Sequence, residues 1–162
     1  MLARYSVIEL NTAVKPYCMK YLFNLGYQHA IYIDPDIYFY QPITLLDNLL
    51  EEYDVIMTPH MVEPYPNDGK EQRLQTIMLA GICNFGFIAV KNTENGNKLA
   101  DLWKEQLFDK CYVDTASGLF TDQKWGDWFP SLFDKVYILK NRGCNAAYWN
   151  LHERVITKKD NV

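Results

Sequence analysis

Two carboxylates separated by a single residue are the first candidates for chemistry in this sequence. Asp34 and Asp36 follow the apolar run Ile31-Tyr32-Ile33, and Pro35 between them stiffens the turn. Neighbouring carboxylates at the edge of a core are costly unless a positive group lies close to them. A divalent cation such as Mg²⁺ or Mn²⁺ is the simplest such group, since one or two carboxylates commonly hold it together with substrate phosphates. The pattern therefore predicts a metal and phosphate site, and an ordinary acidic turn is the alternative.

The elements that must position these residues can be read from apolar spacing. Helices are expected over residues 11–25, 45–50, 72–79 and 92–107, with a short helix or turn over 122–128. Strands are expected over residues 30–33, 54–57, 87–90 and 136–139. Asn11 or Thr12 is expected to cap the first helix, with Pro16 in its first turn. This alternation predicts an α/β, Rossmann-like layered domain with a mainly parallel central sheet flanked by helices.

Polar residues collect where the expected strands end. Asp34 and Asp36 follow the first strand, His60 follows the second and Asn145 follows the fourth. In open α/β sheets, ligands bind beyond the carboxyl ends of the strands. We therefore expect these side chains to lie together at one edge of the sheet.

Four blocks of the sequence, in the same order, resemble those of nucleotide-sugar glycosyltransferases of the GT-A fold. They are the metal motif Asp34-Pro35-Asp36, the Asn-x-Gly block over 83–90, the Asp-Gln block over 121–125 and a last block over 143–151. The set is similar to that of the retaining glycogenin-like and lipooligosaccharide-galactosyltransferase-like family. The resemblance covers nearly the whole chain. It implies hexosyl transfer, with retention of configuration, from a nucleotide-diphosphate sugar such as a UDP-sugar to a glycan acceptor.

The same resemblance assigns the metal and diphosphate contacts. It implies that Asp36 is the stronger ligand of Mn²⁺ or Mg²⁺ and that Asp34 contacts the metal or the donor ribose. Such a metal stabilises the negative charge on the leaving nucleoside diphosphate. Lys15 lies one helix before the motif, where such enzymes often carry a basic donor contact. An exposed helical lysine is the alternative reading of this residue.

The resemblance also implies a sugar pocket. Asn84 and Gly86 are expected to bind the donor, since an amide can fix sugar hydroxyls and a glycine admits a ligand close to the backbone. Asp122 and Gln123 match the block under the transferred sugar and are the expected catalytic pair. Asn145 is expected to bind substrate. The alternatives are a simple Asn-Gly turn and a helix-capping Asp followed by an exposed Gln. We expect Asn84, Asp122 and Gln123 to converge beside the metal turn.

Two histidines are further candidate site residues. His60 ends the second expected strand, where it could reach a ligand, although a structural role is favoured. His152 is a candidate third metal ligand, but its surroundings do not match the late histidine block of the family. A structural role is favoured for it as well.

Composition excludes several classes of protein. The chain has 162 residues, of which 49% are hydrophobic, and we expect one domain over 1–154 followed by a tail over 155–162. A net charge of −4 excludes a generic nucleic-acid binder, and no apolar run reaches the ~18 residues of a membrane span. The spacing of the four cysteines fits neither a disulfide framework nor a zinc site, so free thiols in the cytoplasm are expected: Cys18, Cys83, Cys111 and Cys144.

Two other functions remain open. An Asp-nucleophile phosphatase also places Asp-x-Asp after a buried strand, but Tyr38 stands where that class usually has a small residue. The other is a sugar- or nucleotide-binding remnant without catalysis. Metal-dependent nucleotide binding without turnover would favour this remnant.

The length ahead of the metal motif is also informative. A GT-A fold normally opens with a βα unit, which needs roughly 30 or more residues before the metal-motif strand. Residues 11–25 are already assigned to a helix, and the eight residues after Arg154 leave no room for the family's late histidine block. We therefore expect a chain truncated at both ends, with weak activity and an uncovered surface that favours self-association.

Overall fold

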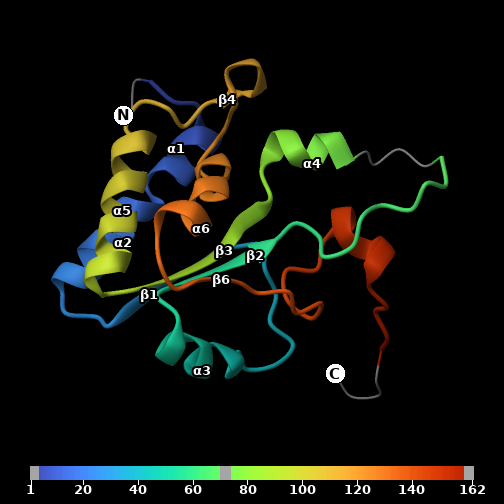
Figure 1. Cartoon of the computed structure of the whole chain (residues 1–162), viewed down its shortest axis with the longest axis horizontal. Helices are drawn as coiled ribbons and strands as arrows, with labels where there is room; N and C mark the ends of the chain where they lie inside the picture. The colour runs from blue at the N-terminus through green and yellow to red at the C-terminus, as the bar shows by residue number, and fades with distance from the viewer. Residues whose placement is uncertain (1–3, 70–73, 159–162) are drawn as a thin grey trace.

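The computed structural model of the chain describes residues 4–69 and 74–158, and a four-stranded sheet lies at its centre (Figure 1). The strands stand in the order β1-β3-β2-β6. Their bounds are His29–Ile33 for β1, Val55–Pro59 for β2, Cys83–Lys91 for β3 and Val136–Ile138 for β6. Each of these strands coincides with a short apolar run of the sequence, so the positions of the expected strands are confirmed.

The predicted mainly parallel sheet is wrong. Strand β3 lies between β1 and β2 and is antiparallel to both, and only β2 and β6 pair in parallel. The reason lies in the connection from β2 to β3. It leaves and re-enters the sheet at the same end, where the His60 N–H donates to the Ile82 carbonyl at 2.9 Å. The chain must therefore run back along β2. The amino end of β3 consequently meets the carboxyl ends of β1, β2 and β6.

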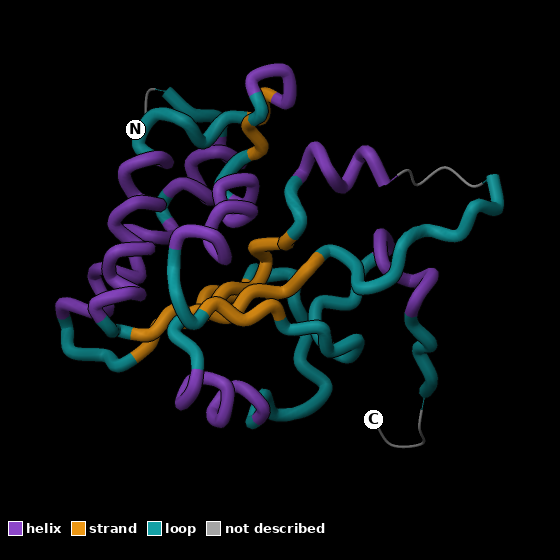
Figure 2. The backbone as a smooth tube through the Cα atoms, viewed as in Figure 1, coloured by secondary structure: helices purple, strands orange, loops and turns teal. Residues whose placement is uncertain are grey.

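Helices cover both faces of the sheet, as the layered prediction requires. Helices α2 (Lys15–Asn24), α5 (Glu94–Leu107) and α6 (Phe129–Leu132) lie on one face, and α3 (Leu45–Glu52) lies on the other (Figure 1). The core between the first three and the sheet is largely aromatic around Trp103, Phe85 and Phe129. A smaller apolar cluster fixes α3 below the sheet. The two layers hold the strand ends in place, and long loops gather beyond them (Figure 2).

The predicted first helix is two helices. Helix α1 spans Val7–Ala13 and α2 begins at Lys15, with Pro16 in its first turn as expected. The expected caps are wrong, because Ser6 caps α1 through a capping box in which its side chain accepts from the Glu9 N–H and Glu9 accepts from the Ser6 N–H. The break between α1 and α2 at Val14 starts a new helix at Lys15, and the Lys15 side chain points toward the sheet.

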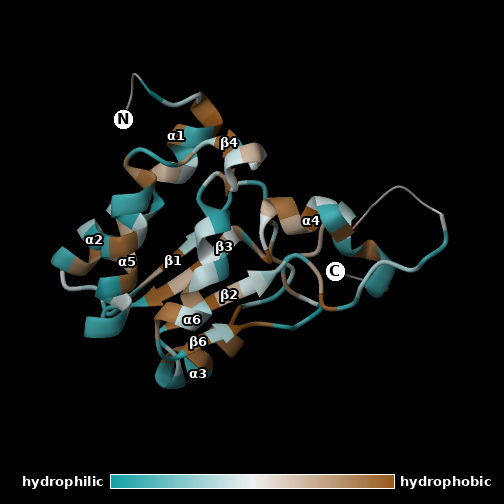
Figure 3. Ribbon diagram, turned by 45° about the horizontal axis from the view of Figure 1, so that its top comes forward, coloured by the Kyte–Doolittle hydropathy of each residue, from teal (hydrophilic) through white to brown (hydrophobic). Residues whose placement is uncertain are grey.

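The remaining elements surround the strand ends. Helix α4 spans Leu74–Ala80, β4 spans Val113–Asp114 and β5 spans Leu119–Phe120. Three 3₁₀ helices complete the described chain, at Thr115–Ser117 (η1), Gln123–Trp128 (η2) and Tyr148–Glu153 (η3). Two residues of the expected helix over 72–79, Gln72 and Arg73, lie outside the described residues. Helix α4 contains apolar residues (Figure 3), and among them Leu74, Met78 and Leu79 are exposed. Self-association through such a surface stays a prediction.

Two further expectations concern the cysteines, expected as free thiols, and the absence of a membrane-spanning run. All four cysteines are free thiols, and burial raises the pKa of Cys83 and of Cys111 to about 12 in each case. In the described parts of the chain, no helix has both the length and the apolar character needed to cross a bilayer.

Candidate functional site

The metal turn and the Asn-x-Gly block meet at Gly86. The Asp34 N–H donates to the Gly86 carbonyl at 2.8 Å, which continues the pairing of β1 with β3. A Cβ atom at Gly86 would lie 2.8 Å from Asn84 Oδ1 and 3.1 Å from Asp34 Oδ2. A side chain at position 86 would therefore collide with these two oxygens, so the backbone of β3 requires glycine here. Carboxylate oxygens such as Asp34 Oδ2 are the ligands that a hard cation prefers.

Asn145 reaches the Asn-x-Gly block from the loop after β6. Its φ of 54° is in the left-handed region, which asparagine tolerates better than most residues. Its Nδ2 donates to Asn84 Oδ1 and to Thr58 Oγ1, at 3.2 Å in each case. The side chains of β2, β3 and the last block therefore form one hydrogen-bonded row at the strand ends.

Tyr32 fixes the carboxylate of Asp34. The two residues are two positions apart on β1, so they share a face, and the Tyr32 hydroxyl donates to Asp34 Oδ1 at 2.7 Å. Burial, followed by the nearby carboxylates of Asp34, Asp122 and Asp36, raises the pKa of Tyr32 well above its ordinary value. The phenol therefore stays protonated and remains a donor. Asp36 itself is exposed at the tip of the turn.

Lys15 and Asp122 form an ion pair inside the molecule. Their charged atoms are 2.8 Å apart, and the side chains are 3% and 2% exposed. The same ammonium donates to the Phe85 carbonyl at 2.8 Å and lies 4.3 Å above the centre of the Tyr32 ring. Burial raises the pKa of Asp122, and the charge of Lys15 opposes the rise. The pair therefore supports the strand that carries Gly86 from behind, and a direct substrate contact by either residue stays a prediction.

Gln123 and Asn84 line a shared cavity of about 650 Å³. Gln123 Nε2 donates to the Ala80 carbonyl at 2.9 Å, which fixes the amide against the end of α4. The wall also contains aromatic rings, among them Tyr65, Tyr148 and Trp149. The structure thus brings two of the three expected pocket residues to one cavity. It places the third, Asp122, beneath that cavity in the core.

The histidines have protein partners. His60 is buried, lines the same cavity, and burial lowers its pKa, so its ring is neutral at pH 7. His152 Nε2 lies 2.8 Å from the Glu63 carbonyl, in the loop after β2. Its expected alternative, a structural role, accounts for this contact. Asn150, which the sequence reading did not select, is fully buried and donates to the carbonyls of His60 and Asn145. It ties η3 to the end of β2.

The carboxylates at the turn fit a metal held partly by substrate. Among the residues that the structure describes, no group of three or more His, Cys, Asp or Glu side chains is arranged to hold a metal ion. Mg²⁺ usually keeps several waters and takes one or two carboxylates plus substrate phosphates, so it does not require such a group. Asp34 and Asp36 satisfy that smaller requirement.

Tyr32 and Thr58 are site residues that the sequence reading missed. Each had a signal. Tyr32 lies two positions before Asp34 on a strand and so shares its face. Thr58 is the polar residue that closes the otherwise apolar run of β2.

Comparison with known proteins places the chain in a family. It is 29% identical over 140 residues to the uncharacterized protein YfnF of Bacillus subtilis (strain 168), covering 82% of this chain and 44% of that protein. It is also 29% identical over 82 residues to the uncharacterized protein YfnD of the same organism, covering 49% of this chain and 26% of that protein. The chain therefore spans less than half the length of either relative. No solved structure matches it. The model of one family matches residues 7–147, from the start of α1 through the Asn145 loop, and the chain belongs to that family, the nucleotide-diphospho-sugar transferases.

Proposed function

We propose that this chain carries the donor site of a metal-dependent glycosyltransferase that takes a sugar from a nucleotide-diphosphate sugar, with UDP as the expected nucleotide. The observation that carries the proposal is the meeting of the Asp34-Pro35-Asp36 turn with the Asn-x-Gly block, where the Asp34 N–H donates to the Gly86 carbonyl at 2.8 Å. Asp34 Oδ2 and Asn84 Oδ1 lie so close to this backbone that a side chain at position 86 would collide with them. The membership in the nucleotide-diphospho-sugar transferases supports the same reading.

In this proposal Asp34 and Asp36 hold Mn²⁺ or Mg²⁺ against the diphosphate. The metal supplies Lewis-acid stabilisation of the charge that develops on the leaving nucleoside diphosphate. Tyr32 keeps the Asp34 carboxylate oriented by donating to Oδ1, which leaves Oδ2 for the metal side. Orientation of a metal-binding carboxylate by a hydrogen-bond partner is a common requirement of such sites.

The sugar is proposed to occupy the cavity lined by Asn84 and Gln123. Both amides have fixed orientations, because Asn145 and Gly86 donate to Asn84 Oδ1 and Gln123 donates to Ala80. Gln123 is the proposed catalytic contact to the sugar carbon. Asp122 and Lys15 are assigned a positioning role in place of the expected direct contacts, because both are buried and paired with each other.

Calorimetric titration of UDP tests the metal site. The wild-type chain is expected to bind UDP with Mn²⁺ and to lose that binding in EDTA. Asp34→Asn and Asp36→Asn should each lower the metal-dependent affinity by about tenfold or more, since even partners of metal ligands contribute about 10- to 100-fold. Asp109→Asn is the matched control, an exposed aspartate with no side-chain partner among the described residues. Equal affinity in Mn²⁺ and EDTA would contradict the proposal.

The finer assignments are part of the same proposal. A carbohydrate or glycan acceptor, transfer with retention and membership of the glycogenin-like group rest on the resemblance of the sequence blocks. Screening nucleotide sugars for slow Mn²⁺-dependent hydrolysis would identify the donor. The anomeric configuration of the first-formed product, measured by NMR, would then test retention.

A further inference from the structure

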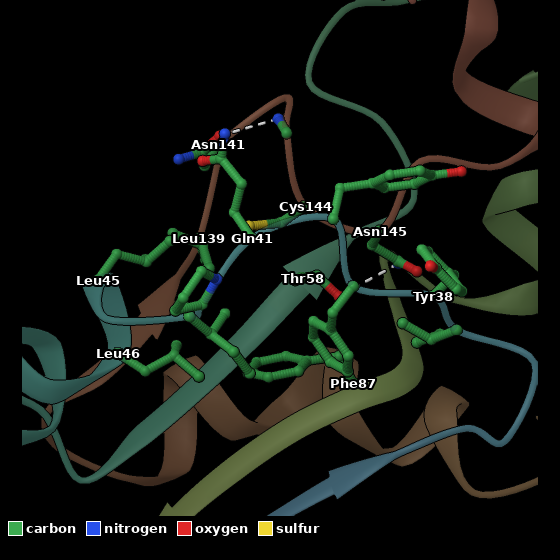
Figure 4. Close-up of a pocket in the computed structure, with 16 residues that line it drawn as sticks. Tyr38, Gln41, Leu45, Leu46, Thr58, Phe87, Leu139, Asn141, Cys144 and Asn145 are labelled. Atoms are coloured by element: carbon green, nitrogen blue, oxygen red, sulfur yellow. Dashed lines mark hydrogen bonds between the residues drawn. The ribbon is translucent and has the colours of Figure 1, made fainter. Parts of the chain in front are cut away.

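A second cavity, of about 400 Å³, begins directly after the metal turn. Its walls come from residues 37–46 on one side and 139–145 on the other, with Thr58 and Phe87 from the strands between them (Figure 4). Its volume lies within the range of about 300–1,000 Å³ that is common for small-ligand sites. The donor site as proposed above does not use this cavity.

The two cavities meet at Asn145. This residue lines the 400 Å³ cavity, and its Nδ2 donates to Thr58 Oγ1 in the same wall and to Asn84 Oδ1 in the wall of the 650 Å³ cavity. The hydrogen bond to Thr58 is drawn in Figure 4. A molecule in the smaller cavity would therefore lie next to a sugar in the larger one, with a single amide between them.

The lining of the smaller cavity carries no charge. None of its sixteen described lining residues is an Asp, Glu, Lys, Arg or His. Such a wall offers nothing to neutralise a diphosphate or a carboxylate, so an anionic ligand would be desolvated without compensation. The chemistry of the wall therefore selects a neutral molecule.

The polar groups of the wall are uncharged and partly unused. Asn141 Oδ1 accepts from the Gly143 N–H at 2.8 Å, and within residues 4–69 and 74–158 its Nδ2 has no protein partner. The side-chain amide of Gln41 has none in the same range either. Amides with free donors and acceptors, next to rings, match a ligand that has hydroxyls on an apolar frame.

The rings at the mouth form a corner. Tyr38 and Tyr40 are 75% and 73% exposed, and their centroids are 4.8 Å apart at an interplanar angle of 60°. A saccharide can pack its C–H face on an exposed aromatic ring, and a nucleobase can stack on such a ring too. The two rings therefore offer a stacking surface, and competition with uridine distinguishes the two ligands.

We propose that the 400 Å³ cavity is the acceptor subsite and that it takes a neutral saccharide. This inference rests on the proposed function, because it places the acceptor beside the donor sugar across Asn145. In it, Tyr38 and Tyr40 stack on the sugar, and Gln41 and Asn141 bind its hydroxyls.

Ligand-observed saturation-transfer NMR tests the assignment. The probes are the methyl glycosides of glucose, galactose, mannose and N-acetylglucosamine, each offered to the chain alone and to the chain with UDP and Mn²⁺. At least one glycoside is expected to receive saturation. The double variant Tyr38→Ala/Tyr40→Ala should reduce that signal at least fivefold. Tyr21→Ala, at another exposed tyrosine on α2, should leave the signal unchanged.

Controls separate this proposal from the donor site. Calorimetric binding of UDP with Mn²⁺ should be the same in the double variant and the wild type. If UDP fails to bind while a glycoside binds through Tyr38 and Tyr40, the donor assignment fails and the saccharide site stands. The saccharide proposal is overturned if no glycoside of the panel receives saturation. It is also overturned if uridine alone displaces the bound glycoside, or if Tyr148→Ala in the other cavity abolishes the saturation signal.

Discussion

Lys15 and Asp122 show how a buried ion pair can support the backbone of the site, while a direct contact of either residue with substrate stays a prediction. Taking two charges out of water costs more than their attraction returns unless hydrogen bonds complete the pair. Here the Phe85 carbonyl and the Tyr32 ring complete the surroundings of the ammonium. The pair thus joins α2, β1, β3 and η2 behind Gly86. Its role is to hold that backbone in one position.

Breaking this pair should be far more harmful than removing both charges. Lys15→Met should lower the free energy of unfolding by about 3–5 kcal/mol, because it leaves the Asp122 carboxylate buried and unpaired. The double variant Lys15→Met/Asp122→Leu should lose less than the sum of its two single variants. Urea unfolding of the three variants measures this coupling, with Lys98→Met on the exposed face of α5 as the control. Additive losses would show that the two charges do not interact.

At this scale, the sequence predicted that polar residues gather at the strand ends, and it did not predict that Asp122 pairs with Lys15 in the core. Asp34, Asn84, Gly86 and Asn145 meet because they stand at the ends of strands, and strand ends are visible as the limits of apolar runs. Burial of Lys15 is different. It depends on the break between α1 and α2, which starts α2 at Lys15, and on the chain before η2, which brings Asp122 from far along the sequence. No local sequence pattern predicts that Lys15 and Asp122 form an ion pair.

In helix α1, a single side chain, that of Glu9, both caps the helix and joins it to a neighbouring strand. Glu9 accepts from the Ser6 N–H with one carboxylate oxygen and from the Val113 N–H, at 3.0 Å, with the other. The first bond closes the capping box, and the second joins α1 to β4. Backbone donors at Val113 and Ser6 lower the pKa of Glu9 below its ordinary value. The sequence contained this signal as Ser6-x-x-Glu9, but the helical spacing after residue 11 concealed the earlier start.

Replacement of Glu9 should therefore have a pH-dependent effect. A carboxylate with a lowered pKa in the folded state stabilises the protein above its unfolded pKa, near 4.5, and loses that effect as the pH falls through the folded value. Glu9→Gln should lower the free energy of unfolding by about 1 kcal/mol at pH 7 and by less at pH 3. Denaturant unfolding at both pH values measures the difference, with Glu105→Gln on α5 as the control. An equal loss at both pH values would contradict the assigned role.

The whole molecule is organised around β3. This strand pairs on both sides, carries a row of buried residues over 85–90, and begins with the Asn-x-Gly block at the site. Its position was predictable from its apolar run. Its direction was not, because a run of buried residues reads the same in either orientation. The structure reveals it through the hydrogen bond from the His60 N–H to the Ile82 carbonyl, which brings the two ends of the β2–β3 connection together.

Hydrogen exchange should reflect this organisation. Amides of β3 are expected to exchange most slowly, since they open only when the sheet separates on both sides. The β4 and β5 hairpin, which has two residues in each strand, should exchange fastest among the strands. Exchange measured by mass spectrometry over minutes to hours would show the order. Slower exchange in the hairpin than in β3 would be inconsistent with this arrangement.

The central place of β3 also has a consequence for biosynthesis. Strands β1 and β2 do not pair with each other, and the partner they share leaves the ribosome only after residue 83. At about 5–20 residues per second, the nascent chain carries two unpaired strands for roughly one to five seconds after residue 59 is added. During that interval their open edges are available to other nascent chains. The strand order that assembles the site therefore also creates a vulnerable period in translation.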